Sequence, residues 1–336
     1  MTYSIWITST CNMKCIYCYE GQEKMNLKMD VIMADHVMEF IHNHFYKIDD
    51  NKLDIDFHGG EPFLNYPIML YIVKKMKEYY RNTDVSINFY TTTNATILNE
   101  EMLEFVVKNI PDITVSIDGD PETQNSMRPM KNGGKSYDIV IHNCLKILEQ
   151  LPNIRVRMTV NSNNVRNLYN NVSHLVKLGF KIIVPALDIF DKQWDETTIE
   201  ILEMQIRRLR EVYSVCKDLS ISIIDEAMLK LKNKGYCSGG KYSINIYTTG
   251  KLFPCMMVCG IEEFCIGDIW NGIDKIKRDR ILEDSRKISP ICKGCNAYLD
   301  CDGARCKLIN KILTGDYYTP PAIQCAIEHL NYKMFS

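Results

Sequence analysis

The stretch "CNMKCIYC", Cys11 to Cys18, carries three cysteines within eight residues. It follows the short apolar run "YSIWITST", which has the composition of a β-strand. In a reducing compartment, clustered cysteines are more often metal ligands than disulfide partners. Three thiolates leave one coordination position open, and an open position is typical of a catalytic metal site rather than a structural one. The motif therefore predicts a reactive metal centre directly after the first strand.

Composition limits the function classes that the chain fits. Its 336 residues contain 40 Lys and Arg against 42 Asp and Glu, a net charge of −2 that offers no basic stripe for nucleic acid. No apolar run approaches the roughly 18 residues of a membrane span, and "MTYSIWITST" has no basic segment of a secretion signal. We therefore expect a cytoplasmic protein with no membrane or nucleic-acid partner, whose 14 cysteines serve mostly as ligands. Cys144 and Cys216 stand alone in helical patterns and are expected to pack in the core.

Strand and helix patterns alternate through the first two-thirds of the chain, which predicts a parallel sheet with helices packed outside it. Six strand–helix units would form a partial (β/α)6 TIM-like barrel. From Tyr236 onward cysteine and glycine become frequent, so we predict a barrel over residues 1–225 and a small cysteine-rich module over 226–336. The expected strands are 3–9, 53–59, 86–93, 112–118, 154–160 and 181–190, and the expected helices are 29–45, 66–82, 99–109, 136–150, 164–179 and about 196–218.

Loops that follow the strands of a parallel α/β barrel gather on one face, where catalysis takes place. The three cysteines would thus lie at the mouth of the barrel. Cysteine thiolates hold Fe–S clusters, and three of them can bind three corners of a [4Fe–4S] cluster, which leaves the fourth iron open.

The Cys-x3-Cys-x2-Cys spacing, with an aromatic residue before the last cysteine, resembles the signature of the radical S-adenosylmethionine enzymes. "HGGEP" (58–62), "TTTNAT" (91–96) and "VSIDG" (115–119) follow in the order in which that family has similar segments. Taken singly, "HGGEP" is by default an ordinary strand-to-helix turn, "SIDG" is equally a turn, and Leu187 is more often a core residue than an adenine contact. The resemblance implies S-adenosylmethionine as cofactor, with contacts from Tyr17, Gly59, Gly60, Glu61, Asn94, Ser116, Asp118 and Leu187.

The second module resembles the SPASM extension of peptide-modifying radical enzymes, which binds two auxiliary [4Fe–4S] clusters. Its pattern here is Cys237-x12-Gly250-x4-Cys255, then Cys292-x2-Cys295-x5-Cys301-x4-Cys306 and a late Cys325. The resemblance implies one cluster on Cys292, Cys295, Cys301 and Cys325. It implies the other on Cys237, Cys255 and Cys306, with Cys259 or Cys265 as candidate fourth ligand. The spacing before Cys306 is one residue longer than usual, and a zinc ribbon is the alternative for the paired cysteines.

The implied chemistry is reductive cleavage of S-adenosylmethionine to a 5′-deoxyadenosyl radical, which abstracts hydrogen from a substrate. An auxiliary cluster would then accept an electron or bind a substrate thiolate. The expected substrate is a ribosomally made, cysteine-containing peptide, and the expected product is a crosslink, for which a thioether is the first choice. Sulfatase maturation, which makes formylglycine, is the alternative. Met256 stands where that group usually has an aspartate base, and this favours the peptide maturase.

Two readings without radical chemistry remain, an Fe–S electron-transfer protein and a zinc-stapled binding module. The radical enzyme needs an external one-electron reductant of the flavodoxin or ferredoxin type. Many peptide maturases begin with a leader-binding domain, whereas the first strand here is expected at residue 3. Leader recognition would then need a separate protein or the barrel itself. No general base is evident from the sequence.

Overall fold

The computed structural model describes the chain except for residues 22–24, 49, 217, 230–235, 299–300, 302, 304 and 336. In the described part, nine strands form one sheet in the order β7-β6-β5-β4-β3-β2-β1-β8-β9. Neighbours in this order pair in parallel, except that β9 runs antiparallel to β8. The strands are β1 (Thr2–Thr8), β2 (Lys52–Gly59), β3 (Ser86–Thr93), β4 (Thr114–Ser116), β5 (Arg155–Val160), β6 (Ile182–Leu187), β7 (Ser220–Ile221), β8 (Ser243–Ile246) and β9 (Leu252–Phe253).

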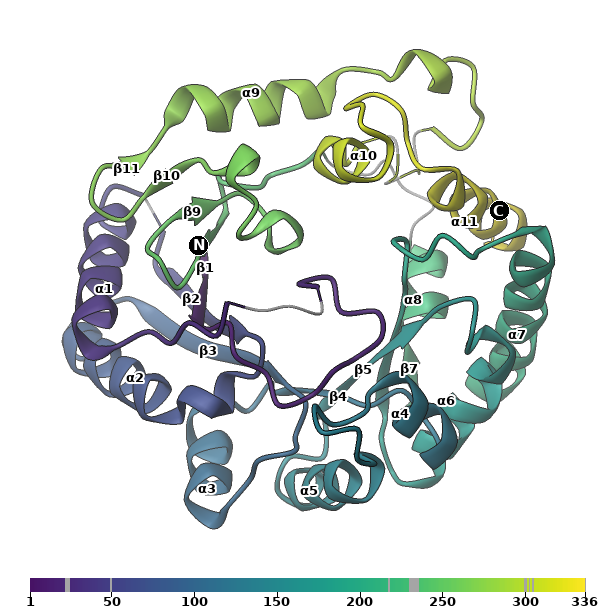
Figure 1. Ribbon diagram of the computed structural model, residues 1–336, viewed down its shortest axis with the longest axis horizontal. Helices are drawn as coiled ribbons and strands as arrows, with labels where there is room; N and C mark the ends of the chain where they lie inside the picture. The colour runs from purple at the N-terminus through teal and green to yellow at the C-terminus, as the bar shows by residue number, and fades with distance from the viewer. Residues whose placement is uncertain are drawn as a thin grey trace.

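Figure 1 shows the helices of the first part as a ring outside the curved sheet, with the last helices on the remaining side. A second, two-stranded sheet of β10 (Gly267–Asp268) and β11 (Gly272–Ile273) lies in this later part. The helices are α1 (Val31–Phe45), α2 (Tyr66–Tyr80), α3 (Glu100–Asn109), α4 (Pro121–Met127), α5 (Tyr137–Gln150), α6 (Leu168–Lys177), α7 (Glu196–Val215), α8 (Ser222–Leu229), α9 (Lys275–Arg286), α10 (Lys307–Thr314) and α11 (Ala322–Phe335).

The predicted mixed α/β fold with a parallel sheet is confirmed, and the six predicted strands appear as β1 to β6. The predicted helices appear as α1, α2, α3, α5, α6 and α7, with ends displaced by a few residues. Asp30, Asn99 and Asp195 begin three of them, because each side chain accepts a hydrogen bond from a backbone N–H of the first turn. Before residue 230 the sequence analysis missed the short elements α4, β7 and α8, and it assigned no helix or strand in the later part of the chain.

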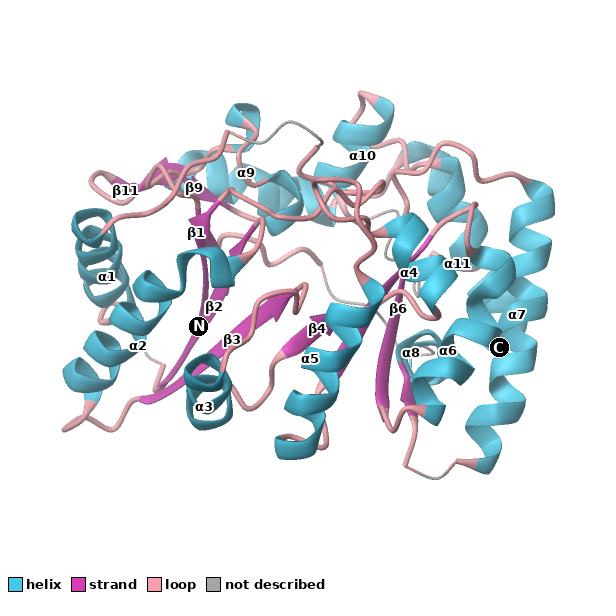
Figure 2. Ribbon diagram, turned by 60° about the horizontal axis from the view of Figure 1, so that its bottom comes forward, coloured by secondary structure: helices cyan, strands magenta, loops and turns pink. Residues whose placement is uncertain are grey.

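The later part of the chain continues the barrel sheet. β8 pairs with the free edge of β1, from Thr2 with Ser243 to Ile5 with Ile246. Ile244 and Ile246 belong to the same buried core as β1 to β7, so the two parts share one hydrophobic interior. Figure 2 shows the strands crossing the molecule with the helices around them and the later segments over one edge of the sheet.

The last helix returns to the barrel. On α11, Lys333 Nζ lies 3.0 Å from a carboxylate oxygen of Glu203 on α7, and the backbone oxygen of Met334 accepts a hydrogen bond from Arg210. The predicted boundary at 225/226 falls within α8 and stays a prediction. Among the described residues, no helix combines the length and the apolar character that crossing a bilayer would require.

The ends of β1 and β2 pack backbone against backbone at Gly59 and Gly60. A Cβ on Gly59, whose φ is +142°, would lie 1.9 Å from the carbonyl oxygen of Thr8. A Cβ on Gly60 would lie 2.4 Å from the carbonyl oxygen of Thr10 and 2.9 Å from the Cβ of Cys11. Glycine is therefore required at both positions for the chain to approach so closely.

Glu61 joins this junction to β3. Its side chain is 1% exposed and accepts hydrogen bonds from Thr93 Oγ1 at 2.8 Å and from the backbone N–H of Asn94 at 2.7 Å. Its own N–H donates to the carbonyl of Thr10 at 2.9 Å. A buried carboxylate is tolerated only when it is bonded in this way. The ends of three strands are thus fixed relative to one another.

We predict that Gly60→Ala destabilises the protein by about 2 kcal/mol, because the new methyl group would overlap backbone atoms that have little room to move. The measurement is the urea midpoint of the apoprotein. Gly134→Ala is the control, since its Cβ would meet mainly the Asn132 side-chain oxygen, at 3.0 Å. Equal midpoints for both variants would contradict the account of this junction.

Candidate active site at the mouth of the barrel

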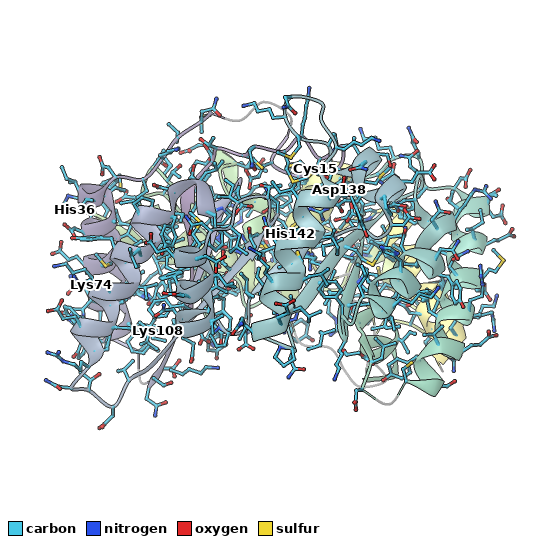
Figure 3. All side chains as sticks on the ribbon, turned by 90° about the horizontal axis from the view of Figure 1, so that it is seen from below. Cys15, His36, Lys74, Lys108, Asp138 and His142 are labelled. Carbon is cyan, nitrogen blue, oxygen red and sulfur yellow. The ribbon has the colours of Figure 1, made fainter. Side chains whose placement is uncertain are left out.

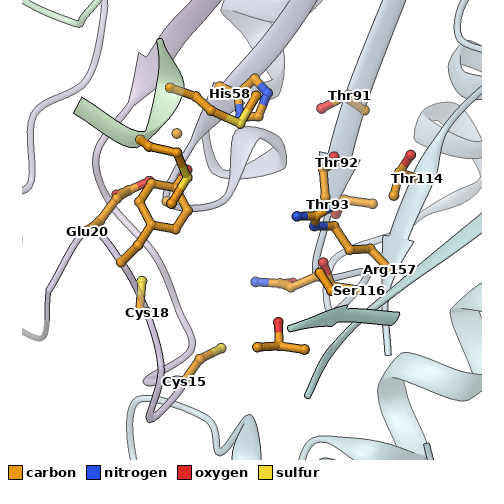
Figure 4. Close-up of a pocket in the computed structure, with 18 of the residues that line it drawn as sticks. Cys15, Cys18, Glu20, His58, Thr91, Thr92, Thr93, Thr114, Ser116 and Arg157 are labelled. Carbon is orange, nitrogen blue, oxygen red and sulfur yellow. The ribbon is translucent and has the colours of Figure 1, made fainter. Parts of the chain in front are cut away.

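A cavity of about 810 Å³ occupies the interior of the partial barrel and extends to the ends of the strands. Its size lies in the range of small-molecule and cofactor sites. Figure 4 shows the cysteine loop on one side of it and the ends of β3 and β4 on the other. The loop supplies Cys11, Cys15, Cys18, Tyr19 and Glu20, and the facing strands supply Thr91, Thr92, Thr93, Thr114 and Ser116.

Backbone hydrogen bonds on both flanks hold the cysteine loop. The N–H of Lys14 donates to the carbonyl of Pro129 at 2.9 Å, and the N–H of Ile16 donates to the carbonyl of Met127 at 3.0 Å. On the other flank, Asn94 Nδ2 donates to Asn12 Oδ1 at 2.9 Å. The loop therefore rests between the end of α4 and the end of β3, with all three thiols at the cavity.

Polar groups near the thiols favour negatively charged sulfur, whereas burial opposes it. The N–H of Met13 lies 3.5 Å from Cys11 Sγ, and Asn94 Nδ2 lies 3.9 Å from the same atom. Burial raises the pKa of Cys15 to about 11, and the nearby guanidinium of Arg128 opposes this rise. Cys15 is thus a thiol at neutral pH until a metal displaces its proton. Three cysteines, N–H donors and a cation are a set of groups that would hold an iron–sulfur cluster.

Arg128 forms a buried cluster with Asp118 and Tyr17. Its Nε lies 3.0 Å from Asp118 Oδ1, its guanidinium lies 5.2 Å from the centre of the Tyr17 ring, and the Tyr17 hydroxyl donates to Asp118 Oδ2. Burial alone would lower the pKa of Arg128, but Asp118, Tyr17 and Cys15 reverse this and raise it. The cluster therefore places a permanent positive charge beside the cysteine loop.

Most of the predicted cofactor contacts line this cavity, but Asp118 does not. Asp118 is 0% exposed, and its carboxylate is used by Arg128, Tyr17 and the backbone N–H of Thr159. The predicted residues that do line the cavity are Tyr17, Gly59, Gly60, Glu61, Asn94, Ser116 and Leu187. The role of each as a cofactor contact stays a prediction.

Several polar residues of the cavity were not singled out from the sequence. Their signal is strict alternation with apolar residues in "DIDFH" (54–58) and "RVRMT" (155–159), because alternate strand residues point to the same face. In a barrel that face is the interior. The residues concerned are Asp54, Asp56, His58, Arg155, Arg157 and Thr159, together with Arg128 after α4 and Asp188 after β6.

The later part of the chain closes one side of the cavity. Met256, Met257 and Ile309 line it. Met256 therefore lines the cavity at the position where the resemblance to the sulfatase-maturing group implies an aspartate, and its side chain there is a thioether.

The cysteines of the later part fall into two neighbourhoods. Around Cys325, burial and the nearby Cys301, Cys292 and Cys295 raise the thiol pKa to about 11. In the other neighbourhood, burial raises the pKa of Cys259, as do the nearby Glu20, Cys255 and Cys265. Burial and the nearby Cys237 raise the pKa of Cys255.

The position of Cys306 follows from its neighbours. The Arg305 guanidinium lies 5.5 Å from the ring centre of Tyr236, which brings the residue before Cys306 next to the residue before Cys237. Considering described residues alone, no three His, Cys, Asp or Glu side chains converge as ligands of a single metal ion would. The predicted cluster ligands therefore stay predictions.

The chain is similar to known iron–sulfur proteins. A family model described as a 4Fe-4S single cluster domain matches residues 1–142. A cysteine-type anaerobic sulfatase-maturating enzyme of Clostridium novyi is 24% identical over 326 residues, covering 88% of this chain and 84% of that protein. An uncharacterized protein of Methanocaldococcus jannaschii is 28% identical over 299 residues, covering 87% of this chain and 93% of that protein.

The fold extends the likeness to almost the whole chain. The solved structure of native anSMEcpe with bound AdoMet and Cp18Cys peptide superposes with a TM-score of 0.79 at 18% identity, covering 99% of this chain and 95% of that one. The match includes both the barrel and the cysteine-rich part. The chain is therefore homologous to the anaerobic sulfatase-maturating radical S-adenosylmethionine enzymes, and it shares the fold of native anSMEcpe.

Proposed function

We propose that this chain is a peptide maturase that binds three [4Fe–4S] clusters and S-adenosylmethionine. The observation that carries the proposal is that Cys11, Cys15 and Cys18 share one cavity with the Gly59–Gly60 junction. When bound there, the cluster and S-adenosylmethionine supply a 5′-deoxyadenosyl radical. The protein contributes the enclosed polar space that positions the substrate and excludes water.

The proposed substrate is a cysteine-containing peptide, and the proposed product is a crosslink with a thioether as first choice. Relatives support a peptide, since a structure similar to this fold contains the Cp18Cys peptide. Met256 at the cavity favours crosslinking over sulfatase maturation, because the acid expected in the sulfatase-maturing group is absent from that position. A flavodoxin or ferredoxin would supply electrons, and a separate protein or the barrel itself would recognise the leader.

Sulfatase maturation is the second candidate, favoured by the 24% identity to the Clostridium novyi enzyme over most of both chains. Pooled synthetic cysteine peptides, incubated with the reconstituted protein, dithionite and S-adenosylmethionine, separate the two by mass spectrometry. Both reactions remove two hydrogens, but crosslinking keeps the sulfur, whereas formylglycine formation also exchanges it for oxygen. We expect the first mass change. Formylglycine would establish the second candidate, and no change in any peptide would contradict peptide maturation.

We predict that Cys15→Ala abolishes 5′-deoxyadenosine formation and lowers the iron content from about twelve to about eight per chain, since each cluster holds about four irons. The auxiliary sites lie on other cysteines and would keep their iron. Cys216→Ala is the control, because Cys216 follows α7 and packs against the apolar core. Deoxyadenosine formed by Cys15→Ala would exclude the assignment of the opening cysteines.

We assign the fourth ligand of the first auxiliary cluster to Cys259 rather than Cys265. The Cys265 thiol donates to the carbonyl of Gly267 at 3.2 Å, a bond that needs the proton that a ligand must lose. Cys259 is close enough to Cys255 for its pKa to be raised by it, and among the described residues its thiol has no such bond. Cys259→Ala should therefore lower the iron content, or convert one cluster to a three-iron form visible by electron paramagnetic resonance. Cys265→Ala should retain about twelve irons. The reverse result would exchange the two roles.

A further inference from the structure

His58, at the end of β2, lines the cavity beside the glycine junction. Its ring stacks on Trp6 of β1, with ring centres 4.8 Å apart and planes inclined by 20°. Its Nε2 lies 2.8 Å from Asp56 Oδ2, and its side chain is 13% exposed. Packing on one side and a carboxylate on the other thus fix the ring in one orientation.

The carboxylate determines which ring nitrogen is available. An ionised carboxylate can only accept, so Nε2 of the neutral ring carries the proton and Nδ1 carries the lone pair. Within the described part of the chain, Nδ1 has no hydrogen-bond partner. A histidine held by a carboxylate with a free basic nitrogen is the arrangement used for general-base catalysis.

Two other carboxylates of the cavity, Asp54 and Asp188, already accept hydrogen bonds. Asp54 accepts from Asn88 Nδ2 at 3.0 Å and lies 3.6 Å from Lys52 Nζ. Asp188 accepts from the backbone N–H of Phe190 at 3.0 Å. Asp188 follows β6, whereas His58 adjoins the glycine junction against which Cys11 packs. Figure 4 shows His58 between the loop that carries Cys18 and Glu20 and the strand that carries Thr91 to Thr93.

We propose that His58 is a catalytic base that accepts the proton of the substrate thiol through Nδ1, with Asp56 as its positioning residue. The inference rests on the proposed function. The substrate loses a carbon-bound hydrogen atom to the 5′-deoxyadenosyl radical, the S–H proton to His58, and one electron to an oxidised auxiliary [4Fe–4S] cluster. A carbon–sulfur bond forms as the C–H and S–H bonds break. His58 thus takes the place of the acid that Met256 replaces.

The test uses the reconstituted protein and a cysteine peptide that it converts, synthesised with deuterium on its carbon atoms. Two quantities are measured for each variant, deuterium in 5′-deoxyadenosine and modified peptide. In His58→Gln we expect deuterium transfer within about twofold of wild type and product lowered by about 100-fold or more, the usual contribution of a general base. In His58→Ala, added imidazole should restore product without changing deuterium transfer. Asp56→Asn should lower product by about tenfold or more.

A control variant shows whether the loss of any histidine–carboxylate pair would have the same effect. His36 is an exposed histidine on α1 whose Nδ1 lies 4.0 Å from Glu39 Oε2, so His36→Gln removes a comparable pair. Figure 3 shows it on an outer helix, away from Cys15. It should leave both quantities unchanged. Iron content and melting temperature of each variant identify loss through misfolding.

The outcomes separate this role from the proposed function. Normal product in His58→Gln, or loss in Asp188→Asn alone, would overturn the role of His58 while leaving the maturase intact. Parallel loss of deuterium transfer and product, without imidazole rescue, would make His58 a structural residue. Absence of product from the wild-type protein with every peptide would contradict the maturase itself and, with it, this role.

Discussion

The contact between Gly59–Gly60 and the backbone of Thr8 to Cys11 determines where the cysteine loop lies. It brings the end of β2 against the end of β1 at distances that leave no room for a Cβ atom. Glu61 then ties the same point to β3 through a carboxylate that is buried and fully used by its hydrogen bonds. A rigid junction of three strands therefore supports the loop that carries Cys11, Cys15 and Cys18. Sites held on such rigid elements are positioned more accurately than sites on free loops.

A second support lies across the cavity. Asp118, at the end of β4, is buried with Arg128 and Tyr17, and this group adjoins Cys15. An ion pair is costly to bury, and removing either partner would leave an uncompensated buried charge that destabilises the protein. Its consequence for the site is electrostatic, because a guanidinium that stays charged favours negative charge on the neighbouring sulfur atoms. Asp118 thus serves the site through Arg128 and Tyr17 instead of facing the cavity.

The sequence was sufficient for the repeating part of the fold. β1 to β6 are short and rich in β-branched residues, and the helices between them have clear apolar periodicity and capping residues. It was not sufficient for β8, whose four residues "SINI" extend the sheet by pairing with β1, 241 positions earlier in the chain, because no local pattern encodes such a partner. The role of Glu61 was hidden for a similar reason. A Gly-Gly-Glu segment predicts only a turn, and the hydrogen bonds from the end of β3 to the Glu61 carboxylate are visible only in the packed structure. His58 and Asp56 were present as alternating polar residues, but their pairing and the free ring nitrogen depend on side-chain geometry.

The central claim is that Cys11, Cys15 and Cys18 hold a cluster whose open iron binds S-adenosylmethionine at this cavity. Electron–nuclear double resonance on the reduced protein, with S-adenosylmethionine labelled with nitrogen-15 at its amino group, tests it most directly. We expect a nitrogen-15 coupling to the cluster that disappears in Cys15→Ala. A spectrum without that coupling in the wild-type protein, with all its iron in place, would contradict it.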